Sequence, residues 1–109
     1  MAPNVRVLQH KGVLDGSSAN NLCAEIVNAA QGDSAIFLLN FQDVTFMNSS
    51  GIGALVAALK EVKKSNSQLF ICSMSTQVSE IFRITKLDKL FKVFESREDF
   101  DQALSSNSL

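Results

Sequence analysis

The stretch FQDVTFMNSSGIGALVAAL, residues 41–59, carries most of the information about the fold. It begins as an apolar run, becomes polar at Asn48, Ser49 and Ser50, and then continues as an apolar pattern with helical period. The helical stripe has an apolar residue at every third or fourth position, at Ile52, Leu55, Val56, Leu59 and Val62. One stripe of this kind indicates a helix with a single buried face. The stretch therefore predicts a packed strand, a short polar corner and a packed helix.

Strands and helices also alternate in the segments before and after residues 41–59. Strand-like runs occupy residues 5–9, 11–16, 35–41, 69–72 and 91–94. Four segments have a helical pattern. The first begins at Ser17 or Ser18 and ends at Gly32, and the second follows the polar corner. The third begins within residues 73–77, and the fourth follows Ser96. Strands that alternate with helices predict a largely parallel sheet with crossover connections. We also expect the first strand to pair with the second as a hairpin.

The predicted fold class is α/β, in one domain that spans residues 1–109 with a flexible tail from about 105 to 109. Its sheet is expected to be mixed but mostly parallel, with four to five strands packed against about four helices. The length of 109 residues supports a core without metals or disulfides. Cys23 and Cys72 stand far apart in apolar patterns, so both are interpreted as reduced, structural thiols.

The composition excludes several classes of function. The net charge is −1 and the isoelectric point is about 5.7, without the basic excess of a nucleic-acid binder. The sequence has no apolar run of membrane-spanning length and no secretory signal pattern, so it predicts a cytoplasmic protein. The default oligomeric state is a monomer.

The residues available for chemistry do not indicate an enzyme. His10 is the only histidine, and it lies outside any nucleophile motif. The glycines at 51 and 53 lack the third glycine of a dinucleotide fingerprint and the GK[ST] ending of a phosphate-binding loop. No cluster of His, Cys or carboxylates suggests a metal, and no cofactor is expected.

The polar corner at Asn48–Gly51 has two interpretations. One is helix capping, in which Asn48, Ser49 or Ser50 accepts a hydrogen bond from a first-turn amide. The other is a phosphate site, because free amides and the positive end of the helix dipole favour an anion there. Capping needs a single residue, whereas three polar residues stand in a row. A phosphoserine at this position would change the surface charge while the helix is kept.

Three segments resemble the STAS domain of bacterial anti-sigma factor antagonists. They are GVLDGSSANNL (12–22), FLLNFQDVTFMNSSGIGAL (37–55) and ICSMSTQVSEIFRITKLDKLFKVFES (71–96), which together cover nearly the whole chain. The family motif is D-S-[ST]-G-[LI]-G after an apolar strand. In that family a serine-kinase anti-sigma factor phosphorylates the first hydroxyl, and a PP2C-type phosphatase removes the phosphate. The unphosphorylated antagonist binds the anti-sigma factor and so frees the sigma factor.

The resemblance implies a role for individual residues of this chain. Ser49 matches the phosphorylated hydroxyl, with Ser50 the less favoured neighbour. The expected surroundings of the phosphate are Asn48, Ser50, Gly51, Gly53 and Asp15. Asp15 matches an acidic residue near the family's phosphorylation corner, although it also fits a simple cap of the following helix. The expected partner-binding surface comprises Ile52, Leu55, Val56, Ser73, Met74, Ser75, Thr76 and Gln77.

Asn48 departs from the family pattern, which has Asp at this position. Asn keeps the capping oxygen but lacks the charge that would repel or orient a phosphoryl group. We expect phosphorylation of Ser49 to persist, because both serines, Gly51 and Gly53 are present. The alternative is a constitutive STAS module that binds a protein or a small ligand without phosphorylation.

Overall fold

The computed structural model describes residues 5–30, 35–107 and 109. The predicted helix end at Gly32 lies outside these residues. Within the described residues the strands are β1 (Val5–Gln9), β2 (Gly12–Leu14), β3 (Ile36–Asn40), β4 (Val44–Met47), β5 (Gln68–Cys72) and β6 (Lys92–Phe94). The helices are α1 (Gly16–Ala30), α2 (Ser49–Lys64), α3 (Thr76–Ile84), α4 (Arg97–Ser105) and the 3₁₀ turn η1 (Leu87–Lys89).

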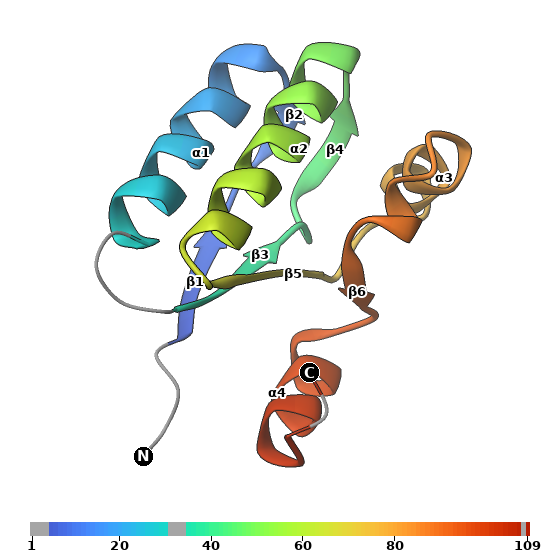
Figure 1. Cartoon of the computed structure of the whole chain (residues 1–109). Helices are drawn as coiled ribbons and strands as arrows, with labels where there is room; N and C mark the ends of the chain where they lie inside the picture. The colour runs from blue at the N-terminus through green and yellow to red at the C-terminus, as the bar shows by residue number, and fades with distance from the viewer. Residues whose placement is uncertain (1–4, 31–34, 108) are drawn as a thin grey trace.

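The strands form two parallel sheets, drawn in Figure 1. The main sheet has the order β1-β3-β5-β6, and the second sheet joins β2 to β4. Every strand pair in both sheets is parallel. This arrangement confirms the predicted α/β fold, because parallel neighbours require crossover connections such as α1 and α2.

The predicted hairpin between the first two strands was wrong. β1 pairs with β3, whereas β2 pairs with β4, a strand that the sequence analysis did not identify as a separate element. The chain turns at Gly12, whose φ is +84°, and the β2–β4 register shifts between Gly12 and Val13. The Gly12 amide donates to the Asp43 carbonyl at 2.8 Å, which holds β2 against the start of β4. β1 thus belongs to the main sheet and β2 to the second sheet.

Two apolar clusters cover opposite faces of the main sheet. In β3, Phe37 and Leu39 belong to the larger cluster, whereas Leu38 belongs to the smaller one. Alternate residues of a strand point to opposite faces, so the two clusters lie on the two sides. α1 and α2 lie side by side over the face of the larger cluster (Figure 1), and Phe100 brings α4 onto the other.

Phe100 is the residue that fixes α4 to the sheet. Its side chain is fully buried, with its ring centroid 5.8 Å from that of Phe70 and 5.5 Å from that of Phe94. The Ser96 hydroxyl accepts from the Asp99 amide at 3.1 Å and begins the helix, as the spacing of these residues predicted. A helix of nine residues is too short to be stable alone, so its order depends on this contact.

We expect Phe100→Ala to lower the free energy of unfolding by about 3 kcal/mol, because it removes a fully buried ring and leaves a cavity. The matched control is Phe46→Ala, since Phe46 remains 44% exposed and should cost less than about 1 kcal/mol. Urea denaturation followed by circular dichroism measures both values. Equal losses in the two variants would contradict the assigned role of Phe100.

Candidate functional site

The polar corner is built where two neighbouring strands end. β2 and β4 are parallel, with Leu14 paired to Met47, so their carboxyl ends lie at the same edge. One residue follows each strand before the next helix starts: Asp15 precedes α1 and Asn48 precedes α2. The amino ends of α1 and α2 are therefore neighbours (Figure 1). Two helix dipoles direct their positive ends toward this corner.

Asn48 caps α2. Its backbone is extended, and its side-chain oxygen Oδ1 accepts a hydrogen bond from the Gly51 amide at 2.9 Å. The amides of the first helical turn have no intrahelical acceptors, and this cap uses only one of them. Ser49 and Ser50 are the first two residues of the helix, and both are exposed. The corner therefore carries an exposed hydroxyl beside amides that can receive an anion.

Asp15 caps α1 through a reciprocal pair with Ser18. The Ser18 amide donates to the Asp15 carboxylate at 2.9 Å, and the Ser18 hydroxyl donates to the same oxygen at 3.0 Å. In return, the Asp15 amide donates to the Ser18 hydroxyl oxygen at 3.0 Å. The Ser18 amide, followed by its hydroxyl, holds the pKa of Asp15 below its usual value, so the carboxylate stays charged. Sequence analysis did not single out Ser18, although the spacing of the pair is that of a capping box.

Close backbone packing brings Asp15 to the first turn of α2. A Cβ added to Gly51 would overlap the Leu14 carbonyl oxygen and would lie 2.9 Å from the Leu14 carbonyl carbon and 3.4 Å from the Asp15 Cα. The Asn48 amide also donates to the Leu14 carbonyl at 3.4 Å. Gly51 is therefore required by packing. Gly53 has open space around it, and nothing in the structure explains its lack of a side chain.

The two serines are not equivalent. The Ser50 side chain faces the start of α1, where a Cβ added to Gly16 would lie 3.0 Å from the Ser50 Cβ. A bulky group on Ser50 would have to fit against that helix. The structure thus brings Asp15, Asn48, Ser49, Ser50 and Gly51 together at one corner.

The predicted partner-binding residues divide into two groups. Ile52 and Val56 are half-buried on α2. Leu55 is only 1% exposed and packs in the core, so its assignment to the partner-binding surface was wrong. The segment 73–77 joins β5 to the start of α3, which packs against β4 and η1, and Figure 1 shows α3 apart from the amino end of α2. A partner that uses both groups must span this separation.

The segment 73–77 has its own local order. Ser73 has a left-handed backbone, with φ at 64°, and its amide donates to the Phe94 carbonyl at 3.2 Å. A left-handed conformation is uncommon for a residue with a side chain. Ser75 then caps α3 by accepting from the Val78 amide at 3.2 Å. Met74, Ser73 and Ser75 are half-buried, and Thr76 and Gln77 are exposed.

Other kinds of site find no support in the described residues. Within 5–30, 35–107 and 109, no three His, Cys, Asp or Glu side chains are grouped to hold a metal. Of the helices in this described part, none has the length and apolar character needed to cross a membrane. Burial raises the pKa of the Cys23 and Cys72 thiols, in keeping with their interpretation as structural residues.

Comparison with known proteins identifies the family. The STAS domain family model matches residues 2–100, so the chain belongs to the STAS domain family. The anti-sigma-B factor antagonist of Staphylococcus aureus is 29% identical over 87 residues, which are 80% of this chain and 81% of that protein. This finding agrees with the resemblance noted from the sequence.

Solved structures share the fold. A sulfate transporter family protein from Wolinella succinogenes superposes with a TM-score of 0.81 at 14% identity, covering 97% of this chain and 92% of that one. The anti-sigma factor antagonist SpoIIAA in its unphosphorylated form gives 0.74 at 21% identity, with 94% and 90% covered. SpoIIAA of Bacillus in its phosphorylated form gives 0.68 at 22% identity, with 94% of both chains covered.

Gly51→Ala is expected to lower the free energy of unfolding by about 2 kcal/mol or more, because the new methyl group forces the α2 start away from Leu14. Gly53→Ala is the control in the same helix, and it should raise stability by about 0.5–1 kcal/mol. Thermal and urea unfolding measure the difference. If both substitutions shifted stability alike, the tight contact between α2 and β2 would be refuted.

Proposed function

We propose that this protein is an anti-sigma factor antagonist that acts in the cytoplasm and is switched by reversible phosphorylation of Ser49. The observation that carries the proposal is the position of Ser49, an exposed hydroxyl at the first residue of α2 in a capped polar corner. The similarity to the S. aureus antagonist supports the choice of this class over other STAS proteins.

The corner suits a phosphate on electrostatic grounds. The first turn of α2 contains no acidic residue, and its dipole and free amides favour negative charge. Asn48 provides the cap without adding a carboxylate, so the nearby negative group is Asp15. A phosphate adds about −1.5 to −2 charges here and would be repelled by Asp15 while the helix end attracts it. The contact between Ser50 and Gly16 favours Ser49 as the acceptor.

The chemistry belongs to the partners. In this proposal a serine-kinase anti-sigma factor transfers the γ-phosphoryl group of ATP to the Ser49 oxygen, with ADP as leaving group and release of the hydroxyl proton. A PP2C-type phosphatase hydrolyses the phosphoester and restores the hydroxyl. This chain contributes the acceptor hydroxyl and the docking surface, and it is not itself an enzyme.

Phosphorylation would act by changing the affinity for the anti-sigma factor. The proposed surface comprises the Ser49 corner, Ile52 and Val56 on α2, and the segment 73–77. A buried dianion that meets a site built for a neutral hydroxyl costs several kcal/mol. A change of about 4 kcal/mol alters affinity about a thousandfold, enough to move the complex between bound and free states.

The second candidate is a constitutive STAS module that binds its partner without phosphorylation. The observation in its favour is Asn48, which keeps the cap but lacks the charge of the family motif. STAS domains also occur outside antagonists, as the STAS domain of a SulP transporter from Vibrio cholerae illustrates. The two candidates differ in whether charge at Ser49 controls binding.

Incubation with the cognate serine-kinase anti-sigma factor, ATP and magnesium should place one phosphate on the wild-type chain. Ser49→Ala should lose it, because the acceptor oxygen is gone, and Ser50→Ala should keep it. Intact-mass and peptide-mass spectrometry locate the group. Phosphate that persists in Ser49→Ala would refute the assignment of the acceptor.

Charge at position 49 should control binding to the same kinase in the absence of ATP. Ser49→Ala should retain affinity within about threefold, whereas Ser49→Asp should lose at least about a hundredfold, because it places a carboxylate in the interface. Isothermal titration calorimetry measures both dissociation constants. Equal affinity of the two variants would favour the constitutive module.

A further inference from the structure

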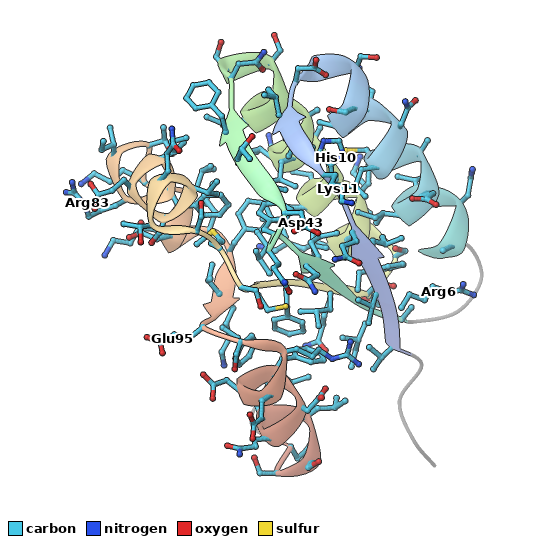
Figure 2. The ribbon with its side chains drawn as sticks, turned by 180° about the vertical axis from the view of Figure 1, so that it is seen from behind. Arg6, His10, Lys11, Asp43, Arg83 and Glu95 are labelled. Carbon is cyan, nitrogen blue, oxygen red and sulfur yellow. The ribbon has the colours of Figure 1, made fainter. Side chains whose placement is uncertain are left out.

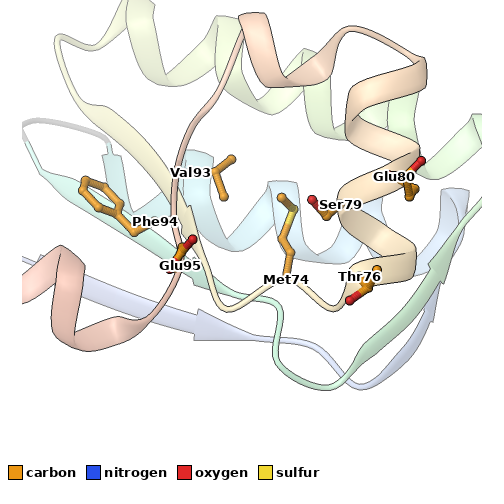
Figure 3. A pocket seen from close by; sticks show the side chains of 7 residues that line it. All are labelled: Met74, Thr76, Ser79, Glu80, Val93, Phe94 and Glu95. Atoms are coloured by element: carbon orange, nitrogen blue, oxygen red, sulfur yellow. The ribbon is translucent and has the colours of Figure 1, made fainter.

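A cavity of about 440 Å³ lies between α3 and β6, away from the Ser49 corner. Its walls come from two separate segments of the chain: residues 74–80, which include the first turns of α3, and residues 93–95 at the end of β6. Figure 3 shows the α3 side chains on one wall, Val93 and Glu95 on the other, and Met74 between them. A volume of this size is within the range of sites for small ligands.

The cavity lies outside the carboxyl ends of two neighbouring parallel strands of the main sheet. These strands are β5 and β6; Glu95 follows β6 directly, and Met74 follows β5 after Ser73. Ser73, with its left-handed backbone, joins these two strand ends through its hydrogen bond to the Phe94 carbonyl.

The lining combines an apolar floor with negative charge. Met74 and Val93 pack against the larger apolar cluster, and this contact holds them in place at the floor of the cavity. Glu80 and Glu95 contribute carboxylates, and no Lys, Arg or His is among the described residues that line the cavity. Thr76 and Ser79 add hydroxyl groups on the α3 wall. This combination matches a cation carried on a short apolar stem.

The two carboxylates are not equally available. Glu80 is bound by Arg83, with the Arg83 Nη2 at 2.6 Å from Oε2, and this pairing holds the pKa of Glu80 below its usual value. Glu95 is exposed and has no hydrogen-bond or ion-pair partner among the residues that the structure describes. Glu95 is therefore the carboxylate left to pair with a ligand.

We propose that the cavity between α3 and β6 binds a guanidinium or ammonium group on a short apolar stem, with Glu95 as its charge partner and Met74 and Val93 as the apolar floor. The group belongs either to a basic side chain of a partner protein or to a free organic amine. The site does not depend on phosphorylation of Ser49. The segment 73–77 would then contribute to binding a cation, separately from the Ser49 corner.

The test uses n-butylguanidine as the probe and n-butylurea as its neutral isostere, in amide NMR titrations of the full chain. We expect n-butylguanidine to bind with a millimolar dissociation constant and to shift the amides of Met74, Val93 and Glu95. n-Butylurea should bind at least fivefold more weakly. Raising the salt from 0.1 to 0.5 M should weaken n-butylguanidine binding at least twofold, because the pair is exposed to solvent.

Glu95→Gln should weaken n-butylguanidine at least threefold, and Ser79→Phe, which fills the cavity, should abolish the shifts. The matched control is Glu98→Gln, since Glu98 is an exposed glutamate on α4 that does not line this cavity. A dispersed amide spectrum verifies that each variant is folded. Equal binding of the charged and neutral probes, or unchanged affinity in Glu95→Gln, would overturn the proposal.

A second arm identifies the source of the cation. If Glu95→Gln weakens the complex with the kinase at least threefold, a basic side chain of that partner occupies the cavity. If that complex is unchanged while the probe still requires Glu95, a free amine is the ligand. Failure of the Ser49 experiments would leave these probe results unaffected, so the two proposals fail separately.

Discussion

The contact between the first turn of α2 and the Leu14 carbonyl is the constraint on which the site depends. It requires glycine at position 51, because any side chain there would overlap the end of β2. With glycine in place, β2 and β4 end side by side and their helices start as neighbours. The polar corner is therefore a consequence of packing, and its hydroxyls lie on a helix turn that is packed tightly against the end of β2. A modification at Ser49 would change the surface charge at the start of α2 without a change in the core.

The two helix caps at the corner differ in charge. At α1 the cap is a carboxylate, held by Ser18 and kept charged. At α2 the cap is a neutral amide oxygen. The corner therefore carries one negative group beside two positive helix ends. Before modification this balance is close to neutral, so an added phosphate would dominate the local field.

Sequence reasoning recovered the helices, the α/β class and the Ser96 cap because these depend on residues close together in the chain. The stripe from Ile52 to Val62 and the spacing of Ser96 and Asp99 are examples of such local signals. It failed for the pairing of the first two strands, since parallel partners lie some thirty residues apart and leave no local signature. The strand before the polar corner was not separated from the run at 35–41, although Gln42 and Asp43 form a turn between β3 and β4.

The candidate site shows the same division. Asn48 and Ser49 could be identified from one short motif, whereas the closeness of Asp15 to Gly51 depends on the β2–β4 pairing. The family resemblance assigned Leu55 to the partner-binding surface, although the helical stripe placed it on the buried face, and the structure buries it in the core. The cavity between α3 and β6 could not be foreseen, since two segments that are separate in the chain form it.

The neutral cap also explains how the corner tolerates a departure from the family motif. Capping requires an acceptor oxygen that reaches the Gly51 amide, and both Asn and Asp supply one. The charge at position 48 is therefore not needed for the start of α2. Under the proposed function, that charge would act only on the field that a kinase, a phosphatase or a phosphate meets at Ser49. In that proposal the residue at position 48 would adjust the response to phosphorylation, while either Asn or Asp keeps the cap that stabilises the fold.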